Sequence, residues 1–231
     1  MGDGILGILE LENKPLTYPG ALCAPETFHF PVKRITVRGA TVLKLVDGDP
    51  SVKDAYVSAA RELESKGVTA ITTNCGFSAL FQTEVAAAVS VPVALSSLLL
   101  VPLMAKTLPK GRKVGILTYD SDKLSEHHFA AAGWSSSEVG VSIAGIEGSV
   151  TWRQLAEPVP DVPPELIAKD VLTAVKSLME TEPSVSTLVL ECAGFTLAAE
   201  TVRRETGLPV ADFVSMANML VEVSPPARYP R

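Results

Sequence analysis

Apolar and polar positions alternate along the chain between two periods, which predicts strands and helices in turn. Apolar runs or two-residue alternation, typical of strands, occur at residues 5–10, 34–39, 68–75, 91–95, 113–118, 139–146 and 187–192. Apolar stripes at helical spacing predict helices at residues 51–66, 78–89, 121–132, 165–180 and 213–223, with further helices ending near Leu108 and Thr206. Strands that alternate with helices indicate an α/β fold whose parallel sheets carry helices on both faces.

Local signals set the expected ends of these elements. Ser51, with Asp54 three residues later, is expected to open one helix, and Gly67 to end it. Ser121 or Asp122 is expected to open another. Residues 148–164 contain four prolines and are expected to be irregular.

The net negative charge of the chain argues against two classes of binding partner. The chain has 231 residues, with 26 acidic and 20 basic side chains. An acidic chain lacks the basic patch that nucleic acid or anionic lipid attracts, so we expect neither as a partner. Residues 85–105 are uncharged but contain two prolines and three serines, which favours a strand and a buried helix over a membrane span. No signal peptide is recognisable at the start, and we expect a cytoplasmic protein.

The chain contains three cysteines, Cys23, Cys75 and Cys192, and no CxxC pair. This spacing argues against a structural zinc site and a disulfide framework, and it favours a reducing compartment. The histidines at positions 29, 127 and 128 do not supply a ligand cluster, so we expect no metal. No nucleotide-binding fingerprint is present, and we expect no cofactor.

An internal repeat relates residues 70–93 to residues 187–210. In each unit a strand leads to a cysteine, a Phe-hydroxyl pair follows, and Pro-Val-Ala begins 17 positions after the cysteine. The hydroxyl pairs are Phe77-Ser78 and Phe195-Thr196. The repeat predicts two pseudo-symmetric lobes, each a parallel sheet flanked by helices, with the active site in the cleft between them. We expect lobe 1 at residues 1–98, joined by a returning C-terminal helix at about 210–231, and lobe 2 at residues 99–209.

Cys75 and Cys192 each lie at the carboxyl end of a strand, where ligands bind in parallel sheets, and just before a helix. A helix N-terminus lowers a cysteine pKa, and its N–H groups can hold a carboxylate. If the lobes face each other, one thiolate can remove a proton from a carbon and the opposite thiol can return one. Ser78, Thr196 and nearby backbone amides are expected to stabilise the carbanion.

Other interpretations of these cysteines stay open. Buried cysteines are mostly inert, and Cys23, outside the repeat, is interpreted as a bystander. In one alternative, Cys192 is the nucleophile of a hydrolase and Glu191 assists it. That chemistry needs only one cysteine, so the repeat argues against it. A small-molecule binding protein on a two-lobed frame is another alternative.

The segments Thr73-Asn74-Cys75-Gly76-Phe77-Ser78 and Leu190-Glu191-Cys192-Ala193-Gly194-Phe195-Thr196 resemble the half-sites of the aspartate/glutamate/hydantoin racemase superfamily. Residues 114–118 resemble the opening strand of its second lobe. The resemblance implies two α/β lobes, no cofactor, a homo-oligomer (dimer or tetramer), and Cys75 with Cys192 as an acid/base pair. It also places Thr118 at the substrate cleft.

This chain departs from the family pattern after both cysteines. Amino-acid racemases usually have Asn-Thr after the first cysteine, where this chain has Gly76-Phe77. Ala193-Gly194 is closer to hydantoin racemases, whereas Cys-Gly-Phe and the segments at 19–20 and 25–32 look like algal dimethylsulfoniopropionate lyases. Arylmalonate decarboxylases, which keep one cysteine, are a further branch.

The sequence therefore predicts a cofactor-independent racemase of a small chiral carboxylate, amino acid or hydantoin. The alternative is a lyase or decarboxylase that uses the same cysteine site. The expected substrate-binding residues are Asn74, Gly76, Phe77, Ser78, Thr118, Tyr119, Gly194, Phe195, Thr196 and Glu10. Tyr119 fits a cleft wall or simple packing equally well.

The two half-sites differ in one neighbour: Asn74 precedes Cys75, and Glu191 precedes Cys192. A carboxylate disfavours a nearby thiolate, so we expect Cys75 to be the base and Cys192 the acid. This inequivalence suits a one-way elimination or decarboxylation. Neighbours on a strand point to opposite faces, which would weaken the effect of Glu191.

Overall fold

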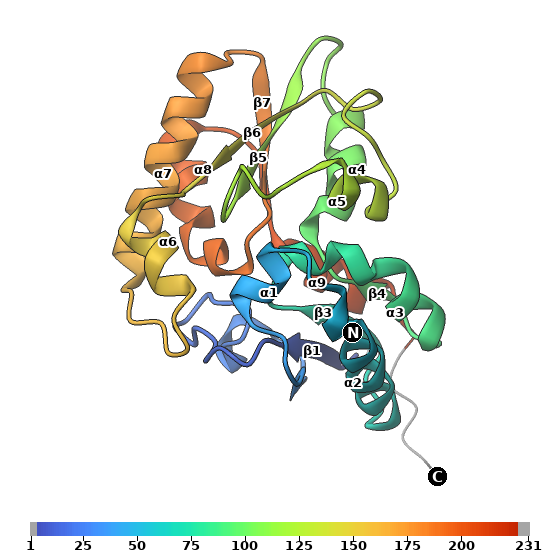
Figure 1. The fold of residues 1–231 in the computed structure, drawn as a ribbon. Helices are drawn as coiled ribbons and strands as arrows, with labels where there is room; N and C mark the ends of the chain where they lie inside the picture. The colour runs from blue at the N-terminus through green and yellow to red at the C-terminus, as the bar shows by residue number, and fades with distance from the viewer. Residues whose placement is uncertain (1–3, 226–231) are drawn as a thin grey trace.

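The computed structural model describes residues 4–225 and consists of two lobes (Figure 1). Each lobe is built on a four-stranded parallel sheet, with strand orders β2-β1-β3-β4 and β6-β5-β7-β8. The expected α/β fold with two pseudo-symmetric lobes is confirmed. The strands of lobe 1 are β1 (Leu6–Glu10), β2 (Val32–Thr36), β3 (Ala70–Thr73) and β4 (Val93–Ala94). Those of lobe 2 are β5 (Lys113–Thr118), β6 (Val141–Gly145), β7 (Val185–Leu190) and β8 (Val210–Ala211).

Helices connect the strands and cover both sheets. The first half of the chain carries η1 (Pro25–Thr27), α1 (Val42–Val46), η2 (Pro50–Val52), α2 (Lys53–Ser65), η3 (Gly76–Phe81), α3 (Gln82–Ala88), η4 (Ser97–Leu100) and α4 (Val101–Lys106). The second half carries α5 (Glu126–Ala131), α6 (Val150–Leu155), α7 (Pro164–Thr181), η5 (Ala193–Ala198), α8 (Ala199–Thr206) and α9 (Phe213–Val223). The η elements are 3₁₀ turns.

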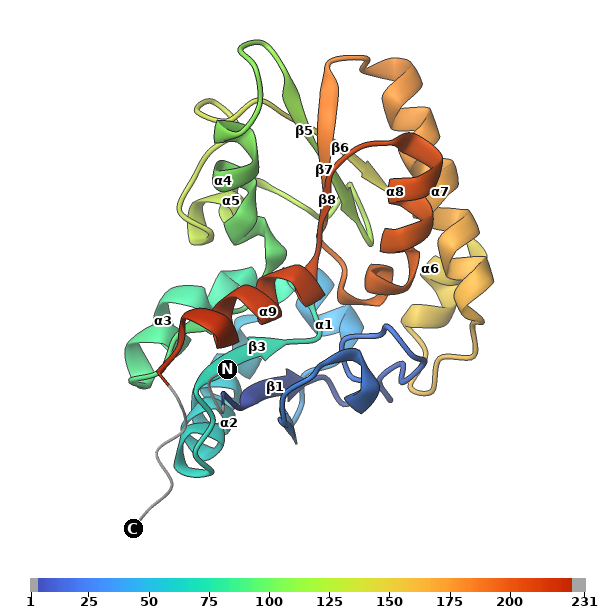
Figure 2. The same cartoon turned by 180° about the vertical axis from the view of Figure 1, so that it is seen from behind.

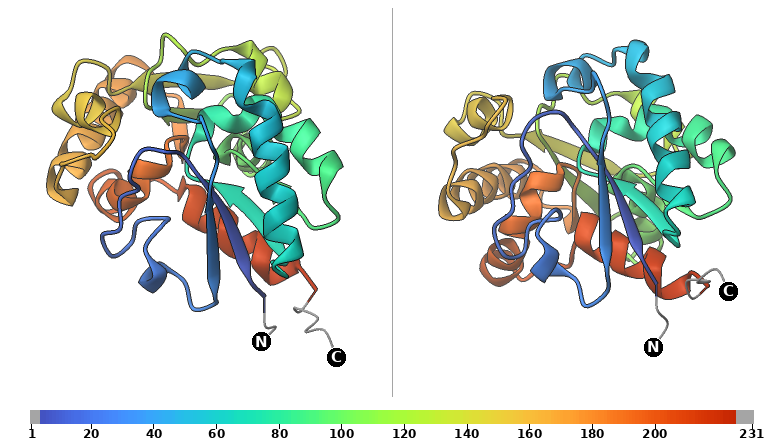
Figure 3. Two further views of the ribbon diagram at one scale, coloured as in Figure 1. Left: turned by 60° about the horizontal axis from the view of Figure 1, so that its bottom comes forward. Right: turned by 90° about the horizontal axis from the view of Figure 1, so that it is seen from below.

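Helices α2 and α9 cover opposite faces of the lobe 1 sheet (Figures 2 and 3). Gly7 of β1 faces Leu63 of α2, whereas Gly4 faces Val221 of α9. An odd separation along an extended segment turns these two positions to opposite sides. The last helix of the chain therefore packs on the first lobe.

The repeat in the sequence corresponds to a repeat in the structure. Equivalent residues lie 117 positions apart throughout the unit: Cys75 matches Cys192, η3 matches η5 at both ends, and β4 matches β8. A side chain from each helical unit also bonds the matching strand carbonyl. Gln82 Nε2 donates to Val93 O at 2.9 Å, and Arg203 Nη2 donates to Val210 O at 2.9 Å.

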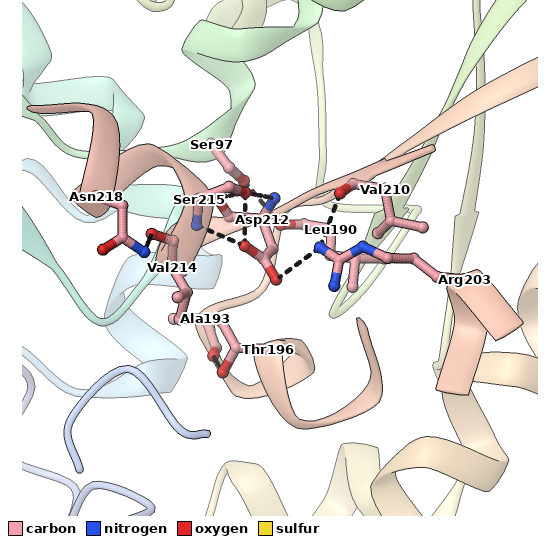
Figure 4. A network of polar contacts seen from close by, with 10 residues as sticks. All are labelled: Ser97, Leu190, Ala193, Thr196, Arg203, Val210, Asp212, Val214, Ser215 and Asn218. Atoms are coloured by element: carbon pink, nitrogen blue, oxygen red, sulfur yellow. Dashed lines mark hydrogen bonds and ion pairs between the residues drawn. The ribbon is translucent and has the colours of Figure 1, made fainter. Parts of the chain in front are cut away.

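A polar network fixes the passage from lobe 2 back to lobe 1 (Figure 4). Asp212 caps α9 by accepting from the backbone N–H of Ser215 at 2.8 Å, and its other oxygen faces Arg203 at 3.8 Å. Nearby, Ser97 Oγ donates to Leu190 O at 2.8 Å. Ser97, at the crossing from lobe 1 to lobe 2, thus holds the last residue of β7, two positions before Cys192.

Several element ends differ from the sequence prediction because other caps are used. Asp49 accepts from Ser51 N, so the helical segment opens at Pro50, and α2 begins at Lys53. The helix expected from Ser121 begins at Glu126, since Ser125 forms a capping box with His128 and the Ser121 hydroxyl bonds Glu147 instead.

Two helices were missed by the pattern. Residues 150–155, expected to be irregular, form α6, whose N-cap Ser149 accepts from Trp152 N. Residues 42–46 form α1, capped by Thr41. Strand β2 begins at Val32 and ends at Thr36, earlier than the 34–39 prediction. Leu98 and Val101, in an apolar run that would suit a partner surface or the interior, are fully buried.

Candidate active site

A cavity of about 90 Å³ lies between the lobes and contains both cysteines of the repeat. Segments of both sheets meet here at their carboxyl ends, the usual ligand site of parallel sheets. Its walls are mainly apolar. The lining residues are Leu11, Asn13, Lys14, Pro15, Leu16, Leu22, Cys23, Val42, Val46, Asn74, Cys75, Phe77, Tyr119, Leu155, Pro160, Glu191, Cys192, Ala193 and Gly194.

Cys75 is the N-cap residue of η3 and is 9% exposed. The backbone N–H groups of Phe77 and Ser78, with the Ser78 hydroxyl, favour its thiolate. Burial and the nearby Glu191 carboxyl act more strongly in the opposite direction, and they raise the pKa of Cys75 to about 12. Ser78 also lies 2.7 Å from the Tyr56 hydroxyl, which fixes its side chain.

Cys192 occupies the equivalent N-cap position of η5 and is more exposed than Cys75. The backbone N–H groups of Gly194 and Phe195 favour its thiolate. Burial, Glu191 and Cys75 together raise the pKa of Cys192 well above its ordinary value. Both thiols are therefore protonated in the free site at neutral pH, and Glu191 is a shared cause.

Glu191 is fully buried where the lobes meet. Its Oε2 accepts from Thr118 Oγ1 at 2.8 Å, and the Tyr119 backbone N–H also favours the ionised form. Burial outweighs these bonds and raises the pKa of Glu191 to about 7. Within residues 4–225, Oε1 finds no hydrogen-bond partner. A Cβ added to Gly76 would overlap this carboxyl and the Glu191 carbonyl, so only glycine fits there.

Asn74 is the lobe 1 counterpart of Glu191. Its Oδ1 accepts from Leu11 N at 2.9 Å, just after β1, as Glu191 Oε2 accepts from the Thr118 hydroxyl at the end of β5. The two side chains thus tie the same pair of strand ends in each lobe. One of them is a neutral amide and the other is a titratable carboxyl.

The loop after β1 crosses to lobe 2 and closes one side of the cavity. Asn13 Nδ2 donates to the carbonyls of Ala156 at 3.2 Å and Glu157 at 2.9 Å, and Lys14 N donates to Pro158 O at 2.8 Å. Among the described residues, Lys14 is the one basic side chain that lines the cavity. An anionic ligand would meet it at the rim.

Cys23 also lines this cavity, although it lies outside the repeat. It is 4% exposed, and burial together with Glu10 raises its pKa well above the ordinary value. Arg34 donates to Cys23 O at 2.9 Å and pairs with Glu10 at 3.3 Å. Glu10 therefore pairs with Arg34 beside Cys23 and does not itself line the cavity.

A model of the family described as Asp/Glu/Hydantoin racemase matches residues 36–221, which include both cysteine half-sites. The chain belongs to this family. The resemblance of the two cysteine motifs is thereby confirmed.

Curated relatives of this chain are named as lyases. The dimethylsulfoniopropionate lyase of Durusdinium sp. clade D is 27% identical over 222 residues, which cover 94% of this chain and 73% of that protein. Dimethylsulfoniopropionate lyase 5 of Emiliania huxleyi is 25% identical over 229 residues, covering 88% of this chain and 44% of that protein. The chain thus spans less than half the length of the Emiliania huxleyi lyase 5.

Solved structures share the fold of this racemase-family chain. Unliganded arylmalonate decarboxylase has a TM-score of 0.58 at 17% identity, covering 98% of this chain and 96% of that one. Allantoin racemase from Klebsiella pneumoniae has a TM-score of 0.58 at 16% identity, covering 95% and 86%. Together with the relatives, the family indicates an enzyme of isomerase or lyase type.

The structure brings together about half of the residues that the sequence predicts for this racemase-family site. Asn74, Cys75, Phe77, Tyr119, Cys192 and Gly194 line the cavity. Gly76, Ser78, Thr118, Phe195, Thr196 and Glu10 lie behind or away from it. Thr118 holds Glu191, whereas the Thr196 hydroxyl bonds Ala193 O and its side chain faces a separate groove with Arg203.

Sequence reasoning missed lining residues that come from loops and from the helices α1 and α6. The loop at 11–16 follows the carboxyl end of β1, and that position was a usable signal. Leu155 and Pro160 lie in the segment expected to be irregular, and Cys23 was discounted for standing outside the repeat.

Within residues 4–225, no three His, Cys, Asp or Glu side chains are grouped in a way that fits a metal ion. No helix in that range combines the length and apolar character needed to cross a bilayer.

Proposed function

We propose that this chain is a cofactor-independent lyase that acts on a small carboxylate and eliminates a leaving group from the carbon next to the one that loses a proton. The observation that carries the proposal is the inequivalence of the half-sites, in which Asn74 and Glu191 occupy matching positions. A reversible racemase needs its two thiols to exchange roles. A one-way elimination needs one base and tolerates an unequal partner.

Cys75 is the base in this proposal. As the thiolate, it takes the proton from the carbon next to the carboxylate, and the freed electron pair forms a carbon–carbon double bond. The bond between the neighbouring carbon and the leaving group breaks, and the leaving group departs with the electron pair of that broken bond. For a sulfonium substrate such as dimethylsulfoniopropionate, the products are dimethyl sulfide and acrylate, and Cys75 later releases its proton to water.

Cys192 remains a thiol and donates a hydrogen bond to the charge that develops on the substrate. Lys14 at the cavity rim holds the substrate carboxylate by charge attraction. The apolar wall formed by Leu22, Val42 and Val46 accommodates the methyl groups, and the Tyr119 ring offers a face to a cationic sulfur. The lyase names of the curated relatives support this substrate class.

Dimethylsulfoniopropionate with the purified protein in deuterium oxide tests the proposal. We expect dimethyl sulfide and acrylate in equal amounts, measured by gas chromatography and liquid chromatography. If the protein forms neither product from this substrate or from related β-substituted carboxylates, the proposed elimination is wrong.

The racemase is the second candidate, because thiols from two lobes line one cavity. A panel of chiral carboxylates and hydantoins in the same deuterium oxide decides between the two. Recovered substrate that has gained deuterium and lost its chirality, without elimination products, would establish the racemase instead.

A further inference from the structure

Glu191 is the group that the two half-sites share. Strand β7 ends at Leu190, so the alternation of a strand no longer separates Glu191 from Cys192, and both line the cavity. From the other lobe, Gly76 brings the backbone next to Cys75 against the Glu191 carboxyl. The carboxyl is thus wedged between the two cysteine loops.

Few charged side chains surround this carboxyl. The titratable or charged groups that line the cavity with it are Cys192 on its own segment, Cys75 from lobe 1, Tyr119 after β5, and Cys23 and Lys14 from the loops of lobe 1. Thr118 bonds one of its oxygens, and the other is buried without a partner among the described residues. Its charge therefore acts on the neighbouring thiols with little screening.

We propose that Glu191 is a positioning residue for both cysteines, and that the charge on its carboxyl controls how readily each thiol gives up its proton. An ionised Glu191 holds Cys75 and Cys192 as thiols. A neutral Glu191 allows Cys75 to become the thiolate that removes the substrate proton. The inference rests on the proposed use of the cysteines in proton transfer, and it names the group that governs them.

Thiol alkylation tests this without any substrate. The rates of iodoacetamide labelling of Cys75, Cys192 and Cys23 are measured peptide by peptide by mass spectrometry from pH 6 to pH 10. In Glu191→Gln we expect Cys75 and Cys192 to react at least about tenfold faster at pH 8 than in the wild type, because each thiol ionises at lower pH. Cys23 should keep its wild-type rate.

Matched variants separate charge from structure. Glu182→Gln removes a carboxyl before the opposite end of β7, where it pairs with Lys113, and should change neither rate. Glu191→Asp keeps the charge and should keep both rates within about threefold of wild type. If Glu191→Gln fails to fold, Thr118→Val replaces it, since loss of the 2.8 Å bond favours the neutral carboxyl and should also accelerate labelling.

Labelling rates within twofold of wild type in the Gln variant would overturn the inference, and so would acceleration of only one cysteine. Equal acceleration in Glu191→Asp would overturn it too, because charge would then not be the cause. These outcomes do not depend on which substrate the enzyme takes. Failure of the lyase proposal and failure of this one are therefore distinguishable.

Discussion

The Cys75 and Cys192 half-sites have the same backbone and different electrostatics. Their 3₁₀ turns, helices and short strands correspond at a constant offset, and each cysteine is an N-cap with two backbone N–H groups that favour its thiolate. Yet the pseudo-symmetry makes Asn74 equivalent to Glu191, and Gly76 equivalent to Ala193. The repeat provides the common backbone, and a few side chains make its two halves unequal.

The difference between the halves is concentrated at the lobe boundary. Glu191 fits only because Gly76 has no side chain, whereas the matching position of lobe 2 is Ala193. One lobe thus provides a titratable group and the other provides the room for it. The chemistry that distinguishes the cysteines arises from contact between the halves.

Replacing either cysteine should have the largest effect on turnover. Cys75→Ser should lower turnover by at least about a hundredfold, because the base is lost. Cys192→Ser should cost less, roughly tenfold, because a hydroxyl still donates a hydrogen bond. Steady-state turnover of the elimination measures both. Equal losses in the two variants would mean that the thiols have equivalent roles and would favour the racemase.

The pH dependence of the unfolding free energy should reveal the contribution of Glu191. Its pKa is raised to about 7, so between pH 4.5 and 7 the folded state binds more protons than the unfolded state, and stability falls as the pH rises. Glu191→Gln removes this fall and should gain roughly 3 kcal/mol relative to wild type across that window. Urea unfolding at pH 4.5 and 7.5 measures the difference.

The titration of His128 also changes the pH profile of the unfolding free energy, so the Glu191 effect is measured as a difference between variant and wild type. Burial lowers the pKa of His128 to about 4, so its contribution to stability rises with pH between 4 and 6.5 and opposes that of Glu191. His128 is unchanged in both proteins and cancels in the difference. A constant difference between the variants from pH 4.5 to 7.5 would show that Glu191 titrates normally.

Glycine substitutions should show which lobe needs the close contact. Gly76→Ala drives a Cβ into the Glu191 carboxyl and carbonyl, and we expect a loss of about 2 kcal/mol in unfolding free energy. Gly194→Ala meets Leu155 at 3.5 Å, an ordinary contact, and should change stability much less. Thermal and urea unfolding of both variants test this. Similar losses would place the constraint in the turn itself.

The cavity rim should show the smallest difference. Lys14 lies four residues after β1, whereas Asp122 lies four residues after β5, so only lobe 1 places a cation there. Lys14→Met should raise KM about tenfold with little change in kcat, since it removes binding and not proton transfer. Lys14→Arg should recover most of the affinity. An unchanged KM would remove Lys14 from carboxylate binding.

The sequence determined the frame of this protein. Strand and helix periodicity follows from which positions are buried locally, and it predicted the parallel sheets and the two lobes. The repeat placed Cys75 and Cys192 at strand carboxyl ends, which topology then makes a ligand site. The motifs around these cysteines also sufficed to indicate the family.

Which side chains line the site depends on contacts between distant parts of the chain. Asn13 bonds carbonyls more than 140 positions away, and no local pattern reports such a contact. The alternation rule predicted that Glu191 would point away from Cys192, but the strand ends one residue earlier. The burial of Glu191 and its raised pKa depend on Gly76 from the other lobe, because desolvation is set by everything that surrounds a group and not by its neighbours in the chain.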